Sequence, residues 1–326
     1  MNNSKFLTMT ASPHVKGPIK TKNIMLDVII ALMLPLIWSV YVFGFRALTI
    51  TAVSVVSCVL FEYIYRKLMK KSNTISDLSA IVTGILLAFC LPVTVPLWIP
   101  IVGAFFAIVI VKQLYGGLGK NVVNPALAAR VFLFVAYPSQ VSSYNSIDSA
   151  KLSPIAMNVD VTAGSTPLAK LKEGQLPESG VTDALIGNIP GCIGEISAAL
   201  VILGGIFLIA RKVISWHIPV TYIATVAIIS FIFPAGNISN LDYMLHQLFS
   251  GGLMLAAFFM ATDYVTSPVT KKGRIIYGIG CGLITVFIRF FGGYPEGVSF
   301  AVLIMNLFVW YLDKNTKPKV FGGAKK

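Results

Sequence analysis

The sequence predicts an all-α polytopic membrane protein, with about ten transmembrane helices in two inverted five-helix repeats. Its composition, its apolar stretches and an internal repeat lead to this class. Hydrophobic residues make up 56% of the 326 residues and charged residues only 12%, with a mean hydropathy of +0.80. A water-soluble globule of this size needs more charge on its surface. The lipid bilayer is therefore the expected solvent.

Ten apolar stretches come close to the roughly 20 residues that a helix needs to cross a bilayer. They lie near 24–44, 47–65, 78–93, 97–114, 122–137, 194–212, 217–233, 244–262, 275–291 and 298–312. The second, seventh and ninth are the clearest. Several others are short or contain proline, which lipid tolerates only where protein or a cavity satisfies the freed backbone groups.

The two halves of the chain match at an offset of 176 residues. This offset aligns Pro92 with Pro268, Thr94 with Thr270, Gly116–Gly117 with Gly292–Gly293, Val122 with Val298, and Leu127 with Leu303. Five stretches in each half would invert the second half relative to the first, as in many transporters. The predicted parts are an N-terminal arm at 1–23, a first membrane repeat at 24–137, a loop at 138–192, a second membrane repeat at 193–313 and a basic tail at 314–326.

The net charge of +13 is sorted by position along the chain. With a cytoplasmic N-terminus, 21 of the 26 Lys and Arg residues fall inside, in the segments 5–22, 66–71, 112–130, 211–212, 271–274 and 314–326. The positive-inside rule thus predicts a multi-pass protein of the cell membrane with both termini cytoplasmic and loop 138–192 outside. This sorting argues against nucleic acid as a partner. The polar first 23 residues show no cleaved signal peptide.

Several motifs indicate packing or are missing from the sequence. The four cysteines, at positions 58, 90, 192 and 281, form no CxxC pair, so we expect small packing residues and no iron–sulfur site held by this chain alone. Gly278 and Gly282 form a GxxxG, which in a membrane helix indicates close packing. No GxGxxG, Walker loop, metal-ligand cluster or nucleophile–base pair appears, so neither a catalytic residue nor a metal site is predicted.

Loop 138–192 is the only long polar segment and the first place to look for chemistry. Its run 160–169 is rich in Gly, Ser and Thr. Gly164 would let the backbone approach a phosphate, and Pro167 favours an extended Thr166 that presents its hydroxyl. Taken alone, the run could equally be an exposed turn.

This run resembles the Ser-Gly-Ala-Thr flavinylation motif in the membrane subunits of the Rnf complex and the Na+-translocating NADH:quinone reductase. Further segments are similar across nearly the whole chain: Ser12–His14, Met25–Val28, Gly119–Ala126, Ala261–Asp263 with Thr266–Pro268, and Glu296–Ala301. The Ser-Pro-His start and the short arm are more similar to the D subunits of Rnf than to the B subunits of the reductase.

In this family the last threonine of the motif carries FMN through a phosphoester. The resemblance therefore implies covalent FMN on Thr166, with Gly164 and Ser165 beside it. Ala163 and Ser165 replace the serine and alanine of the family's motif, which leaves Ser165 or Thr162 as alternative acceptors.

The resemblance also implies a noncovalent riboflavin at Asn121 and Asn124. Spaced three apart, these residues would share one face at the start of a helix, where their amides suit the polar edge of an isoalloxazine ring. Helix capping is the alternative role.

Two acidic residues fall within or at the edge of apolar stretches, where an ionisable group is a functional candidate. Asp27 could instead complement a helix dipole from the first turn. Glu62 could pair with Arg66, four residues on.

As a whole, the resemblance implies a flavin-bearing membrane subunit of an electron-transport complex that couples electron transfer from ferredoxin to NAD with translocation of Na+ or H+. Its partners would be the other membrane and peripheral subunits and the lipid bilayer, and it would not be catalytic alone. The alternative from another class is an inverted-repeat channel or secondary transporter, because architecture alone does not separate the two.

Overall fold

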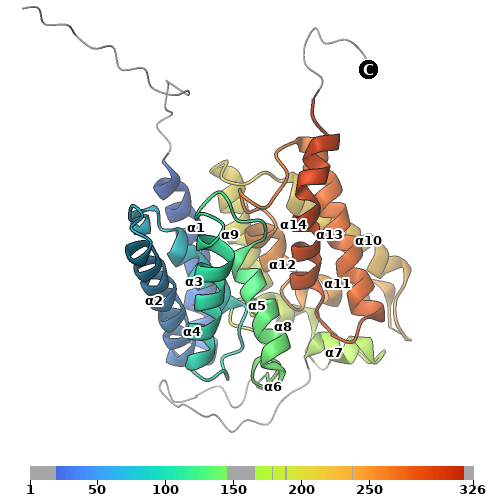
Figure 1. Cartoon of the computed structure of the whole chain (residues 1–326). Helices are drawn as coiled ribbons and strands as arrows, with labels where there is room; N and C mark the ends of the chain where they lie inside the picture. Colours follow the sequence, from blue (N-terminus) through green and yellow to red (C-terminus); the bar gives the residue numbers. More distant parts are fainter. Residues whose placement is uncertain (1–19, 145–165, 178, 188, 237, 319–326) are drawn as a thin grey trace, which may run out of the picture.

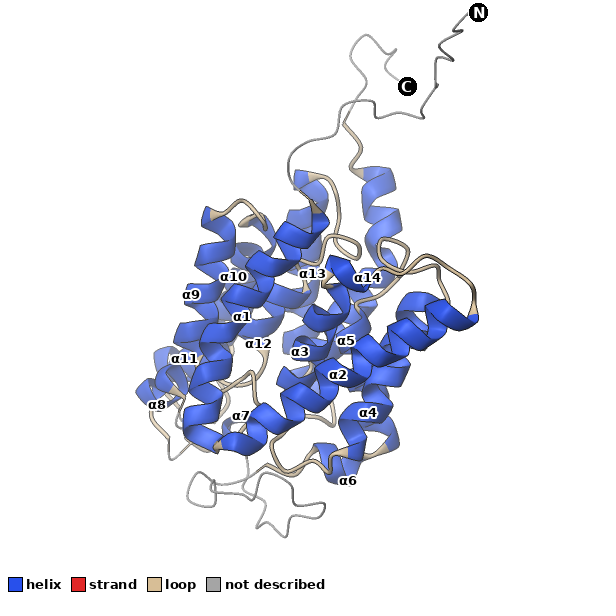
Figure 2. Cartoon of the chain, turned by 90° about the vertical axis from the view of Figure 1, so that its left-hand side faces the viewer, coloured by secondary structure: helices blue, strands red, loops and turns tan. Residues whose placement is uncertain are grey.

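The computed structural model describes residues 20–144, 166–177, 179–187, 189–236 and 238–318, and all regular structure in these segments is helical (Figure 2). Within them the only β-type pairing is one isolated bridge between Pro92 and Cys192. The predicted all-α class is confirmed for the described residues.

The helices before the long loop are α1 (Thr21–Phe43), α2 (Phe45–Leu68), the short 3-10 helix η1 (Ile75–Asp77), α3 (Ser79–Phe89), α4 (Trp98–Phe105) with its π-helical continuation η2 (Phe106–Gln113), and α5 (Pro125–Ala136). The loop region contains α6 (Pro138–Val141), α7 (Pro167–Lys172) and α8 (Val181–Ile186). The second half contains α9 (Ala198–Ala210), α10 (His217–Ile232), α11 (Asn240–Phe249), α12 (Leu253–Leu255) with the π-helix η4 (Ala256–Met260), α13 (Lys271–Phe291) and α14 (Val298–Asn315).

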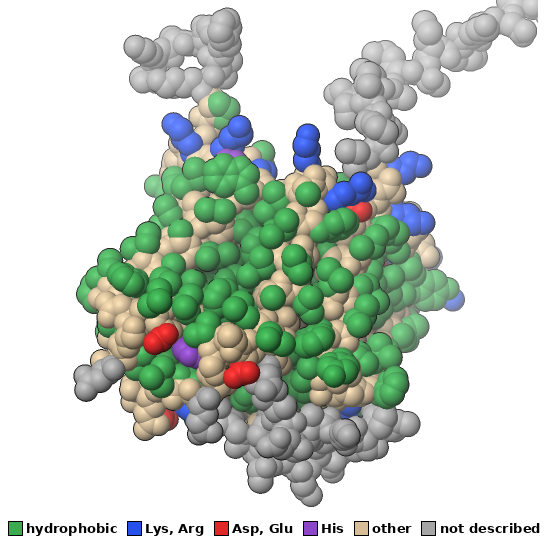
Figure 3. Space-filling model, turned by 180° about the vertical axis from the view of Figure 1, so that it is seen from behind, with side chains coloured by type: hydrophobic (Ala, Val, Ile, Leu, Met, Phe, Trp, Pro, Cys, Tyr) green, Lys and Arg blue, Asp and Glu red, His purple; other side chains and the backbone are tan. Residues whose placement is uncertain are grey.

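Helices α1, α2 and α13 are long and apolar enough to cross a membrane, and α11 with α12 and η4 makes a fourth span if this bent pair crosses as one. Five further apolar helices are shorter, at 10–17 residues. Large apolar side chains such as Ile37, Phe287 and Trp310 are more than 60% exposed. Figure 3 shows such side chains over the middle of one face, with Lys and Arg gathered at one end. This surface suits a bilayer, as the composition predicts.

The described chain begins and ends at the same end of the helix bundle, and α6 and α7 lie at the opposite end (Figure 1). We refer to these as the basic end and the loop end. Helix α5 runs from the basic end toward the loop end. It thereby connects the two regions in which the sequence predicts flavin sites.

Two stretches predicted as continuous helices are broken. The stretch 78–93 is helical only to Phe89, and 244–262 bends by 59° between α11 and α12, where Gly251 has a φ of +74°. A buried arginine covers the freed carbonyl groups at each break. Arg46 donates to Val93 O and Val95 O at 2.8 and 2.9 Å, and Arg289 donates to the carbonyl oxygens of Gln247 and Ser250. Such protein donors make broken helices tolerable in lipid.

The predicted packing role of Gly278 and Gly282 is confirmed. Both are buried on α13 against α10, and a Cβ added to Gly282 would lie 2.6 Å from Thr225 Cβ. The four cysteines are buried and free, in agreement with their predicted packing role. Cys192 additionally accepts a hydrogen bond from Arg130 Nη1, at 3.1 Å.

Candidate functional site

Two pockets lie at opposite ends of α5. The threonine pocket, at the loop end, is bordered by Thr166, Arg130, Glu195, Tyr294 and Glu296 and holds about 1160 Å³ of empty space, part of it open to the outside. The asparagine pocket, at the basic end, is bordered by Asn121, Asn124, Lys112, Ser79 and Asp263 and holds about 750 Å³. Both are in the size range of ligand sites.

Thr166 is the N-cap residue of α7, and its side-chain oxygen accepts a hydrogen bond from Ala169 N at 3.3 Å. Its backbone is extended, with φ −68° and ψ 153°, as the following proline predicts. The residue is half-buried at the pocket wall, so its hydroxyl lies beside the empty space. Gly164, Ser165 and Thr162 lie outside the described residues.

A buried charge cluster borders the threonine pocket. Arg130 Nη2 lies 2.8 Å from Glu296 Oε2 and 3.8 Å from Glu195 Oε1. Glu296 Oε1 also accepts from Gly252 N at 2.7 Å, next to the break between α11 and α12. Burial and the neighbouring Glu296 raise the pKa of Glu195 to about 8, although Arg130 opposes the shift.

The position of Arg130 corrects its grouping with the basic cytoplasmic residues. It lies inside the bundle, in the second turn of α5, and pairs with carboxylates that precede α9 and α14. A guanidinium at this depth requires such partners. Sequence reasoning missed all three residues, although an arginine inside the apolar stretch 122–137 was a usable signal.

Aromatic rings line the same pocket. Tyr294 and Phe300 are stacked at 8°, with their centroids 6.1 Å apart, and Phe134 meets Tyr294 edge-on at 4.8 Å. The pocket thus combines a hydroxyl, a buried guanidinium and flat apolar surfaces. These features suit a ligand with a planar ring and an anionic group.

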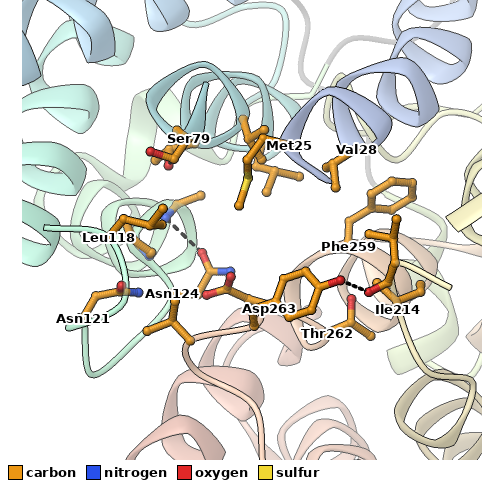
Figure 4. A pocket seen from close by; sticks show the side chains of 18 of the residues that line it. Met25, Val28, Ser79, Leu118, Asn121, Asn124, Ile214, Phe259, Thr262 and Asp263 are labelled. Carbon is orange, nitrogen blue, oxygen red and sulfur yellow. Dashed lines mark hydrogen bonds between the residues drawn. The ribbon is translucent and has the colours of Figure 1, made fainter. Parts of the chain in front are cut away.

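In the asparagine pocket, polar groups from distant parts of the chain face one space. Ser79 lies on the same wall as Met25 and Val28, opposite Asn124, Asp263 and Thr262 (Figure 4). Both π-helices end here, η2 with Lys112 near its end and η4 two residues before Thr262. Irregular helices of this kind are frequent at functional sites.

The structure corrects the expected arrangement of Asn121 and Asn124. They share no helix face, because α5 starts at Pro125. Asn124 caps α5, with its Oδ1 accepting from the backbone N of the second and third helical residues at 3.0 and 3.3 Å, and its Nδ2 donates to Met260 O. Asn121 lies before the helix and donates to Val123 O at 3.1 Å. The capping alternative therefore describes Asn124, and both amides border the pocket.

The two acidic candidates have partners other than those predicted. Glu62 is completely buried and pairs with Lys112 Nζ at 2.8 Å instead of Arg66, which donates to Ser72 O. Asp27 is not in the first turn, because α1 begins at Thr21, and it pairs with Arg211 at 3.3 Å. Glu62 therefore stays a functional candidate beside the asparagine pocket, while Asp27 joins α1 to the end of α9.

Comparison with known proteins covers nearly the whole chain. A model described as the NQR2, RnfD, RnfE family matches residues 8–322. The chain belongs to this family.

Three of the family's curated members are similar along almost their full length, and each is named as the D subunit of a complex. The chain is 47% identical to that of the Na(+)-translocating ferredoxin:NAD(+) oxidoreductase complex of Acetobacterium woodii, covering 98% of this chain and 96% of the relative. It is 41% identical to that of the proton-translocating ferredoxin:NAD(+) oxidoreductase complex of Clostridium ljungdahlii, at 97% and 96% coverage. It is 35% identical to that of the ion-translocating oxidoreductase complex of Aliivibrio salmonicida, at 97% and 99%. The predicted family is confirmed.

Proposed function

We propose that this chain is the flavin-carrying membrane subunit of an ion-translocating ferredoxin:NAD oxidoreductase complex, with FMN esterified to Thr166 and riboflavin in the asparagine pocket. The observation that carries the proposal is the hydroxyl of Thr166 at the wall of a large pocket with ring-sized apolar surfaces. Relatives along the full chain are named as subunits of such complexes. The other membrane and peripheral subunits and the bilayer are the proposed partners.

The residues of the threonine pocket fit FMN. Thr166 would supply the ester oxygen, the guanidinium of Arg130 would face the negative charge of phosphate or reduced ring, and Tyr294 and Phe300 would border the isoalloxazine. Once bound, the flavin supplies the electron-carrying chemistry. The protein's own contribution is to fix its position and to exclude water.

The asparagine pocket fits a flavin without a phosphate ester. Asn121, Lys112 and Asp263 offer donors and acceptors along a wall that otherwise consists largely of apolar side chains. Because the amide of Asn124 is used in capping α5, we assign ring recognition mainly to Asn121. The two flavins would then lie at opposite ends of α5.

We further propose ten crossings in two inverted repeats, with both termini cytoplasmic and residues 138–192 outside. The 176-residue offset carries α4 with η2 onto α13 and α5 onto α14. Each half contains one broken helix with a buried arginine at the break. The gathering of basic side chains at the end where the described chain begins and ends supports this orientation (Figures 1 and 3).

The attachment is tested on denaturing gels viewed under ultraviolet light, with protein from a host that makes flavin transferase. Thr166→Asn keeps an N-cap residue but has no hydroxyl, so it should fold and lose the fluorescent band. Ser165→Ala should keep the band. A band that persists in Thr166→Asn would move the attachment to Ser165 or Thr162.

A further inference from the structure

A buried ion pair connects the asparagine pocket with the loop at the basic end. Lys112, which borders the pocket, donates from Nζ to Glu62 Oε2 at 2.8 Å and to Ser79 Oγ at 2.7 Å. The side chains of Lys112 and Glu62 are 3% and 0% exposed. An ammonium group has three N–H donors, so one remains for a ligand in the pocket.

Two hydrogen-bonded chains lead from this pair to loop residues 70–78. Thr74 Oγ1 donates to Glu62 Oε1 at 2.6 Å, and Ser79 Oγ donates to Asp77 Oδ1 at 2.6 Å. Thr74 and Asp77 are partly exposed. A proton arriving at this loop therefore has a short path to the carboxylate of Glu62.

We propose that Lys112 and Glu62 couple reduction of the flavin in the asparagine pocket to the uptake of one proton from the basic end. Lys112 exchanges its bond to Glu62 for one to the reduced ring, and Glu62 is protonated through Thr74. The inference rests on the proposed riboflavin site and adds to it a defined pair of residues and a direction of proton entry.

The step is balanced in charge. Two electrons, supplied through the complex by a low-potential iron–sulfur protein, and one proton from water give a ring with one negative charge. That charge replaces the negative charge of Glu62 as the partner of Lys112, and the second proton neutralises Glu62. Two electrons and two protons enter, so the buried site keeps its net charge, which a low-dielectric interior favours.

Other charged or titratable groups face the pair from each neighbouring segment. Arg66 lies one turn beyond Glu62 on α2, and Cys58 lies one turn before it. Asp77 reaches the pair through Ser79, and Asp263 faces it from the far wall of the pocket. Only Glu62 contacts Lys112 directly through a carboxylate within 4 Å among the described residues.

The test is a potentiometric titration of riboflavin in the purified full-length chain between pH 6 and 8. Thr166→Asn serves as background, so that the noncovalent flavin is the only one observed. Glu62→Gln retains a side-chain oxygen for Lys112 but cannot take a proton. Its midpoint potential should fall less steeply with pH than that of the background, by one proton, or about 30 mV per pH unit for a two-electron couple.

The double variant Lys112→Met/Glu62→Gln removes both charges and leaves no unpaired buried ion. Relative to Glu62→Gln, it should disfavour the reduced ring at least tenfold, which lowers the midpoint by at least about 30 mV. Asp27→Asn removes the carboxylate of another ion pair, one that does not border the pocket, and should change neither value.

The outcomes separate the inference from the function on which it rests. Riboflavin bound to all variants, with equal pH slopes in the background and Glu62→Gln, would overturn the coupling and leave the site intact. Loss of riboflavin in both charge variants would make the pair a structural support and also overturn the coupling. A background protein without riboflavin would refute the site itself, and the inference with it.

Discussion

Replacing Arg130 by methionine tests the charge cluster of the threonine pocket. The substitution keeps most of the side-chain volume but leaves the carboxylate of Glu296 without the guanidinium that now lies 2.8 Å away. Removing one partner of a buried ion pair destabilises a protein by roughly 3–5 kcal/mol. Glu296 is 20% exposed, and Glu195 can remain neutral because its pKa is raised to about 8. The expected loss is therefore near the lower limit, about 3 kcal/mol.

The assay is thermal unfolding of the purified chain in detergent at pH 6.5. Arg130→Met should lower the transition midpoint by on the order of 5 °C. Arg130→Met/Glu296→Gln should recover most of this loss, because a neutral amide needs no counter-charge. If the double variant is as unstable as the single one, the loss comes from packing of the Arg130 side chain, and the electrostatic reasoning is refuted.

Three further predictions concern proton binding, the second flavin and orientation. Glu195 holds a proton in the folded state at pH values where the unfolded chain has released it, so stability should fall as pH rises from about 5 to 8; Glu195→Gln should flatten this trend in thermal midpoints. Asn121→Leu should lower acid-extractable riboflavin alone, whereas Asn124→Leu should also lower the thermal midpoint, because a lost N-cap costs about 1 kcal/mol. On a cysteine-free background, single cysteines within 140–190 should react with impermeant reagents in intact cells, and those at 70–75 or 314–320 should not; the reverse pattern would invert the orientation.

Local composition was enough to predict the membrane class and the helical regions. An apolar stretch is a property of neighbouring residues, and so is the extended backbone that Pro167 imposes on Thr166. The breaks in the stretches 78–93 and 244–262 were not visible in this way. They depend on Arg46 and Arg289, which reach the free carbonyl groups from other helices.

The charged partners of the candidate sites were predicted least well. The spacing of Glu62 and Arg66 suggests a helical pair, but Glu62 points to Lys112, 50 residues away on η2. Arg130 was grouped with the loop lysines by its position in the sequence, while its actual partners precede α9 and α14. Such pairs are decided by helix packing, which composition and periodicity do not contain.

The most direct test of the central proposal is to locate the flavin on the chain by mass spectrometry. Trypsin should release residues 152–170 as one peptide that contains Thr162, Ser165 and Thr166. Fragmentation of this peptide from flavinylated protein should place the mass of the FMN group on Thr166. An unmodified peptide, or a modification on Thr162 or Ser165, would contradict the assignment of the threonine pocket as the covalent flavin site.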